Sequence, residues 1–269
     1  MRKKDTGKQA QPASATQGPP TERDAPRTRK APETQALARY SGTFAHTTVA
    51  NEIGSRIVRG DYPPGTFLPN EAEWSAMFGV GRSAVREAVK ILMAKNLLAS
   101  RPKIGSWVMP RERWNLLDRD VLGWYAASPN RYEFLKTVQE FRYIIEPEAA
   151  AMAALRHGPG QMAEITAACR EMGTAPTLGE RTAADTRFHV AILRAAGNEL
   201  LLPLGVLIDS ALEQLFAFVT REVNNLRHAQ DLHDEIEKNI RLRRPDAARK
   251  AVRRLLENTD SIIEGQDAA

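Results

Sequence analysis

One segment, residues 70 to 94, constrains the fold of this chain more than any other. Asn70 follows a proline and can cap a short helix that runs to Met77. The next three residues, with a glycine in the middle, make a tight connection, and apolar residues then recur at helical spacing as far as Ala94. A short helix, a tight turn containing glycine and a second helix predict a helix-turn-helix, a geometry that places its second helix in the major groove of DNA.

The residues on either side predict a winged domain around this motif. Before it, apolar residues at helical spacing end at Gly60 and indicate a first helix. After it, residues 97–100 and 106–109 are short apolar-rich segments, and the residues that join them include a proline and a glycine, which indicates a β-hairpin. We therefore expect a winged helix-turn-helix domain, three helices plus a β-hairpin wing, over residues 41–110.

The positive charge of the chain is concentrated in two places. The formal net charge is +5, and residues 1–40 alone hold nine Lys and Arg against four acidic residues, so the remainder is neutral. Within that remainder, residues 72–113 hold eight Lys and Arg against three Glu, which makes them the stretch best suited to nucleic acid. The first 40 residues contain five prolines and few large apolar side chains. We expect a disordered basic tail there, and a disordered C-terminus over residues 265–269.

The start of the second helix of the motif supplies candidate base readers, and the wing supplies candidate contacts to the DNA backbone. Arg82 and Arg86 are four residues apart and share one helical face, and an arginine can donate two hydrogen bonds to one guanine. The alternative is that these basic residues only solvate the surface. The candidate DNA-binding residues are Gly81, Arg82, Ser83, Ala84, Arg86, Lys103 and Gly105.

From residue 126 to residue 264 the pattern changes to amphipathic helices. Strand signals are missing, and breaks such as Gly158-Pro159-Gly160 and Asn224-Asn225 separate five or six helices. We expect an all-α antiparallel helical bundle, which makes the chain mainly α, with residues 111–125 as an interdomain linker. No apolar run is long enough to cross a membrane and no secretory signal is present, so we expect a cytoplasmic protein.

The helical half contains one candidate metal-binding set and one candidate anchor for an acid. Asp185 and His189 are one helical turn apart, a spacing used when one helix supplies two metal ligands, and His233 on a later helix could complete the set. The alternative is that the three residues form hydrogen bonds to a ligand. Arg142 has apolar neighbours, and a guanidinium in such surroundings needs an acid, either the carboxylate of a small molecule or Glu146 four residues on.

Both halves of the chain resemble known families. The segments YPPGTFLPNEAE (residues 62–73) and FGVGRSAVREA (residues 78–88) resemble the DNA-binding domain of the GntR family. In the helical half, the segments FRYIIEP (residues 141–147) and DTRFH (residues 185–189) resemble the FadR subfamily and its FCD effector domain. The linker resembles that of the branch of the subfamily that contains galactonate-operon repressors.

The resemblance implies a homodimer that binds palindromic double-stranded operator DNA and is released from it by a small carboxylate metabolite. In this branch that metabolite is a sugar acid. Arg142 and Asn198 are then the candidate effector-binding residues, with helix capping as the alternative for Asn198. In the family, the position matched by Ala72 is often an arginine that contacts DNA, so one contact of that kind is missing from this chain.

The resemblance also implies a divalent metal, Zn or Ni, held by Asp185, His189 and His233. The family's last histidine ligand falls at Leu255, so the set of four is incomplete and a metal is possible rather than required.

We expect no enzymatic activity, and repression rather than activation. Two alternatives stay open at this point. One is a constitutive dimeric DNA-binding protein whose helical domain senses nothing. The other is a metal-dependent hydrolase built on the metal-binding set, for which the sequence offers no evident general base.

Overall fold

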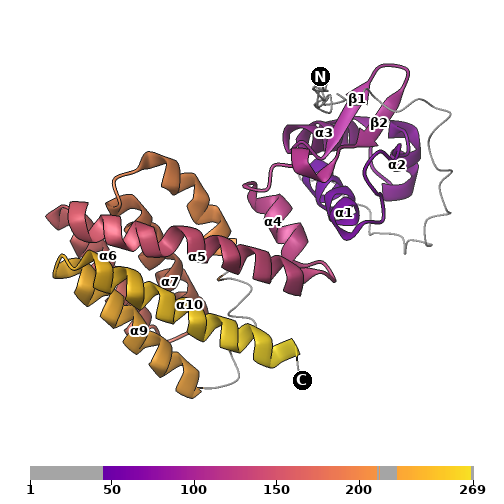
Figure 1. Ribbon diagram of the computed structural model, residues 1–269. Coiled ribbons are helices and arrows are strands. Elements are labelled where there is room, and N and C mark those ends of the chain that lie inside the picture. The colour runs from indigo at the N-terminus through magenta and orange to yellow at the C-terminus, as the bar shows by residue number, and fades with distance from the viewer. Residues whose placement is uncertain (1–44, 211, 213–222, 268–269) are drawn as a thin grey trace, which may run out of the picture.

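The computed structural model describes residues 45–210, 212 and 223–267, which form two domains (Figure 1). The expected disordered tail, residues 1–40, lies outside the described residues. At the other end of the chain the last helix continues to Asp267, so it extends three residues beyond the expected end of the helical domain.

The N-terminal domain is the expected winged helix-turn-helix. Asn70 caps the second helix by accepting hydrogen bonds from the amides of Ala72 and Glu73, and the Glu73 carboxylate accepts one from the Asn70 amide. Gly79 ends that helix with a φ of 65°, a left-handed conformation that favours glycine. The elements are α1 (Ala45–Arg59), α2 (Glu71–Phe78), α3 (Arg82–Ala94), β1 (Leu98–Arg101) and β2 (Gly105–Val108).

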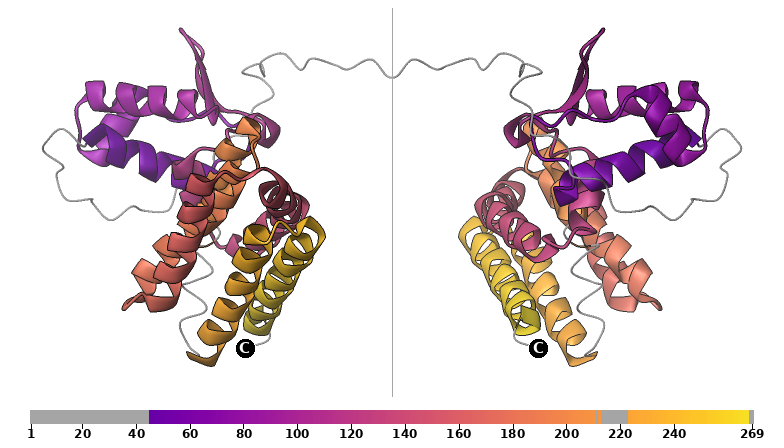
Figure 2. Two further views of the ribbon diagram at one scale, coloured as in Figure 1. Left: turned by 90° about the vertical axis from the view of Figure 1, so that its left-hand side faces the viewer. Right: turned by 90° about the vertical axis from the view of Figure 1, so that its right-hand side faces the viewer.

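Aromatic and aliphatic side chains close the core of this domain. Trp74 on α2 stacks on Phe78 with ring centroids 5.2 Å apart and meets Tyr62 edge-on at 6.0 Å. Val85 and Leu92 are fully buried on the inner face of α3. Ala88 between them is buried as well, whereas Arg86, Glu87 and Lys90 on the opposite face of the helix are exposed. β1 and β2 pair antiparallel, with Leu98 opposite Val108, and the hairpin projects from the domain on the side away from the bundle (Figure 2).

The segment expected to be a linker is folded against the N-terminal domain. It forms a short 3-10 helix, η1 (Arg111–Arg113), and a helix, α4 (Arg119–Ala126). Trp114, Val121 and Trp124 from this segment are buried in the N-terminal core. Gly54 on α1 makes room for Trp124, because a Cβ at position 54 would lie 2.4 Å from the Trp124 ring. Both tryptophans therefore belong to the core of the N-terminal domain, and the segment is part of that domain.

The C-terminal domain is a bundle of antiparallel helices (Figures 1 and 2). α10 packs along α5 and α9, and α6 packs along α7. The expected break at Asn224-Asn225 lies in the first turn of α9. The elements are α5 (Arg131–Arg156), α6 (Pro159–Thr174), α7 (Leu178–Ala195), the 3-10 helix η2 (Glu199–Leu204), α9 (Val223–Arg241) and α10 (Pro245–Asp267). None of the helices in the described ranges is both long and apolar enough to cross a lipid bilayer.

Two contacts of α4 link it to the bundle. Near the end of α4, the rings of Tyr125 and Phe134 stack with centroids 5.6 Å apart. At its start, Arg119 pairs with Asp209, in the helical turn that follows η2, at 2.6 Å. Both ends of α4 therefore contact the C-terminal domain.

Candidate DNA-binding and metal-binding sites

The exposed face of α3 carries most of the expected DNA-binding residues. Gly81, Arg82, Ser83 and Arg86 are exposed, and Ala84 is half-buried against the core. Gly81 caps α3 without a side-chain hydrogen bond, so amides of the first turn are left for another acceptor. A helix start of this kind suits a DNA phosphate.

The two arginines on this face are held differently. Arg86 donates from Nε and Nη2 to the two carboxylate oxygens of Glu71 on α2, at 3.0 and 2.8 Å. These bonds lower the pKa of Glu71 and raise that of Arg86. The side chain of Arg82 forms no hydrogen bond or ion pair with any residue that the structure describes. The sequence did not point to Glu71, whose contact with Arg86 depends on how α2 packs against α3.

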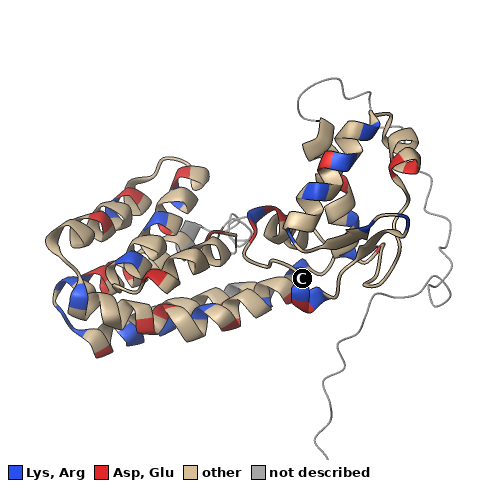
Figure 3. Ribbon diagram, turned by 90° about the horizontal axis from the view of Figure 1, so that it is seen from above, with Lys and Arg blue, Asp and Glu red and all other residues tan. Residues whose placement is uncertain are grey.

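The wing places Lys103 in the turn between its strands and Gly105 at the start of β2. Lys103 and Gly105 both have positive φ, 65° and 104°, and both are exposed. Ile104 between them is 51% exposed. Across both domains Lys and Arg are interspersed with Asp and Glu (Figure 3). The expected basic contacts, Arg82, Arg86 and Lys103, lie on α3 and in the wing.

The expected metal-binding residues come together inside the bundle. Asp185 and His189 on α7 and His233 on α9 are each at most 4% exposed. Asp185 Oδ1 lies 3.2 Å from His189 Nε2 and 3.1 Å from His233 Nε2. One ligand atom from each residue lies within 4.8 Å of the others.

This donor set fits a divalent cation. Asp185 Oδ1, His189 Nε2 and His233 Nε2 are buried but form no hydrogen bond of acceptable geometry. Nitrogen and oxygen ligands about 2.1 Å from a zinc ion, at angles between octahedral and tetrahedral, lie about 3.0 to 3.4 Å apart. The spacing from Asp185 to each histidine falls in that range. Leu255, where the family's fourth ligand is expected, is buried in the apolar core.

Neighbouring oxygens orient both histidines toward Asp185. His233 Nδ1 lies 2.6 Å from the carbonyl oxygen of Ala229, so that nitrogen carries the proton and Nε2 is the free one. His189 Nδ1 lies 2.8 Å from Glu146 Oε2. The sequence did not point to this role of Glu146, because α5 and α7 come together only in the folded bundle.

A chain of buried polar groups continues from Glu146 to α10. Arg142 Nε donates to Glu146 Oε1 at 2.6 Å, and Arg142 Nη1 donates to Gln139 at 3.3 Å. Gln139 in turn donates to the carbonyl oxygen of Leu256 at 3.0 Å. The bundle thus supports His189 with polar contacts that reach through its core.

The charges in this cluster shift each other's protonation. Burial alone would raise the pKa of Glu146, but Arg142 and His189 outweigh it and lower that pKa to about 2. Burial would lower the pKa of His189, whereas Glu146 and Asp185 raise it to about 9. The pKa of Asp185 is lowered against its burial by the two histidines. A cation at this position would therefore have to displace a firmly held proton.

The two expected effector-binding residues lie apart. Arg142 is 1% exposed and paired with Glu146, which favours the structural alternative for this arginine. Asn198 is exposed and accepts a hydrogen bond from the amide of Leu200 at 3.1 Å, so its side chain caps η2. The geometry favours the capping alternative for Asn198.

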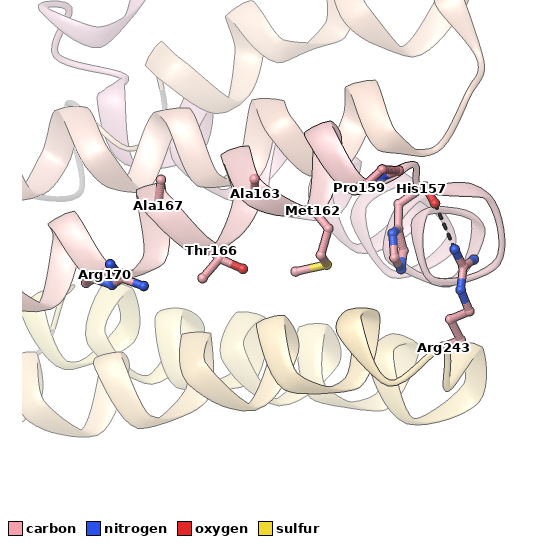
Figure 4. Close-up of a pocket in the computed structure, with 8 residues that line it drawn as sticks. All are labelled: His157, Pro159, Met162, Ala163, Thr166, Ala167, Arg170 and Arg243. Atoms are coloured by element: carbon pink, nitrogen blue, oxygen red, sulfur yellow. Dashed lines mark hydrogen bonds between the residues drawn. The ribbon is translucent and has the colours of Figure 1, made fainter.

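A surface groove lies between α6 and the residues that follow α9 (Figure 4). None of the residues that line it belongs to the metal-binding set. It has a volume of about 590 Å³ and is lined by apolar residues of α6 together with His157, Arg170 and Arg243. Arg243 donates to the carbonyl oxygens of Leu155 and His157 at the end of α5, at 3.0 and 2.9 Å. This arginine therefore serves the fold of the bundle.

Comparisons with known proteins agree with the two domains. Residues 45–108 match the family described as bacterial regulatory proteins, gntR family, and residues 137–258 match the FCD domain. The uncharacterized HTH-type transcriptional regulator YieP of Escherichia coli strain K12 is 35% identical over 216 residues, which cover 79% of this chain and 92% of that protein. The galactonate operon transcriptional repressor of the same strain is 34% identical over 204 residues, covering 74% and 88%.

The fold is also found in a solved structure of Lar, which controls the expression of the Listeria monocytogenes agr system. The two share a TM-score of 0.57 and 16% identity, and the match covers 84% of this chain and 99% of Lar. At this identity the likeness concerns the fold alone.

Proposed function

We propose that this chain, which belongs to the GntR family and has an FCD domain, is a repressor released by a sugar acid. It is a DNA-binding transcriptional regulator rather than an enzyme. The buried convergence of Asp185, His189 and His233 carries the sensing half of this proposal. The similarity to a galactonate operon repressor supports the choice of effector.

We propose that two copies bind one palindromic operator in the cytoplasm. α3 enters the major groove with Arg82 and Arg86 toward the bases, and Ser83 and the amides of the first turn bind phosphates. Lys103 and Gly105 bring the wing against the sugar-phosphate backbone. The two half-sites then lie about 34 Å apart, one turn of DNA.

In the bundle, Asp185 Oδ1, His189 Nε2 and His233 Nε2 would hold a divalent cation, Zn or Ni. Such a cation supplies a positive charge with open coordination positions that an effector carboxylate can bind. Leu255 contributes no ligand, which leaves one more position open than in a four-ligand set. Glu146 holds the ring of His189 in place, and Arg142 neutralises Glu146.

Effector binding must then act on the DNA-binding domain through the contacts of α4. Arg119 pairs with Asp209, in the helical turn that follows η2, and Tyr125 stacks on Phe134 of α5. Operator and effector are coupled reciprocally, so each weakens the binding of the other by the same factor.

Fluorescence anisotropy of the full chain tests this proposal. A duplex selected by the protein from a random DNA library is labelled, bound and titrated with galactonate, gluconate and other aldonates. We expect at least one aldonate to release the duplex. Release by none of them contradicts the sensing proposal, and failure to select any duplex contradicts the proposed DNA interface.

The incomplete ligand set favours one alternative, a constitutive DNA-binding dimer whose bundle senses nothing. In that case neither aldonates nor Zn or Ni ions would raise the melting temperature of the protein. A rise with any of them excludes this alternative.

A further inference from the structure

The ion pair formed by Arg86 and Glu71 is bidentate, because both donors of one guanidinium edge are used. Its bonds are 3.0 and 2.8 Å long, and the side chains are 61% and 40% exposed. A single exposed contact fixes little geometry. Two parallel bonds fix the plane of the guanidinium as well as its position.

The bonded edge leaves the reading edge of Arg86 free. Glu71 accepts from Nε and from one N–H of Nη2, whereas Nη1 and the second N–H of Nη2, at the tip of the side chain, have no partner among the described residues. Two donors at that tip match the O6 and N7 acceptors of guanine in the major groove. The pair is therefore arranged as a guanidinium braced from the side and open at its end.

Glu71 is itself held firmly. It is the first residue of α2, directly after the Asn70 cap, where the helix dipole favours a negative charge. The next residue is Ala72, so α2 carries no arginine beside this carboxylate. Arg82, one turn earlier on α3, has no such brace.

We infer that Glu71 sets the base specificity of Arg86 by holding it for one guanine. This inference rests on the proposed DNA interface. The same carboxylate repels nearby phosphates, so it weakens binding to DNA of any sequence while it improves discrimination. Specificity is the difference between the affinities for the right and the wrong sequence. Glu71 can therefore weaken binding to all DNA and still raise specificity.

The test uses the full chain and a duplex selected by the wild type from a random library. Every base pair of that duplex is varied in turn, and affinities are measured by fluorescence anisotropy. The position read by Arg86 is the one at which Arg86→Ala loses discrimination. We expect Glu71→Gln to lose about tenfold discrimination at that same position, with equal or higher affinity for a scrambled duplex.

Glu87→Gln is the matched control. Glu87 lies on α3 beside Arg86, is exposed and pairs with Lys90 at 2.8 Å. This variant removes the same charge near the DNA, so we expect a similar gain on the scrambled duplex and unchanged discrimination. Thermal melting confirms that both variants fold.

Two results overturn the inference. If Glu71→Gln keeps full discrimination, as Glu87→Gln should, the inference fails and the DNA interface stands. If Arg86→Ala loses discrimination at no position, the inference fails and Arg86 is also removed from the proposed base contacts. A wild type that selects no duplex at all contradicts the proposed interface itself.

Discussion

The Arg86–Glu71 pair and the Arg142–Glu146 pair have the same chemistry in opposite surroundings. On the DNA-binding domain both side chains are largely exposed, and one edge of the arginine stays open. In the bundle both side chains are at most 4% exposed, and Glu146 also contacts His189. An exposed ion pair contributes little to the free energy of folding and leaves its arginine available to a ligand. Removing one partner of a buried pair is strongly destabilising.

The largest effect is expected from breaking the buried pair. Arg142→Met leaves Glu146 without its guanidinium, and removing one partner of a buried pair costs about 3 to 5 kcal/mol. Urea unfolding followed by circular dichroism measures this loss. The double variant Arg142→Met with Glu146→Leu should recover part of it, since no unpaired carboxylate remains. Equal stability of wild type and single variant would mean that burial does not distinguish the two pairs.

The next effect concerns the cation proposed beside the buried pair. Zn at a hundredfold excess over its dissociation constant should stabilise the protein by about 2.7 kcal/mol, and EDTA should remove that gain. Differential scanning calorimetry with and without Zn measures it. His233→Ala is the control, because it removes one of three ligands and should make the melting temperature independent of Zn. A wild-type melting temperature that does not change with Zn or Ni contradicts the metal site.

A smaller effect is expected at the exposed face, and on binding rather than stability. Arg82→Ala should lower affinity for the selected duplex by about 1 to 3 kcal/mol, the contribution of one good base contact. Anisotropy measures the affinity, and Lys90→Ala on the outer part of the same helix serves as the control. Unchanged affinity would show that Arg82 only solvates the surface.

The smallest effect is on stability at the exposed pair. Glu71→Gln should shift the melting temperature by less than about 2 °C, because exposed ion pairs contribute little to folding. Calorimetry checks this beside Arg142→Met. A shift as large as that of the buried variant would remove the contrast between the two surroundings.

Local signals made the N-terminal fold predictable. The Asn70 cap, the left-handed Gly79 and the turn of the hairpin depend on neighbouring residues, and the observed elements begin and end within two residues of the expected ones. The convergence of Asp185 with His189 followed from helical spacing in the same way. That these residues bind metal stays a prediction.

Contacts between distant elements were beyond such signals. Glu71 lies 15 residues from Arg86 along the chain, and Glu146 meets His189 across two helices. Residues 111–125 resemble an interdomain linker, yet Trp124 packs against Gly54 of α1. In each case the partner is set by how helices pack, which no local pattern records.

The packing of α4 on α1 decides where the chain can be divided. A truncated protein that ends at residue 110 would lose Trp114, Val121 and Trp124 from its core and expose the apolar surface they cover. One that ends after Ala127 keeps them. Hybrid regulators that combine this operator-reading module with a foreign sensor should therefore be joined between residues 127 and 130, on the far side of α4.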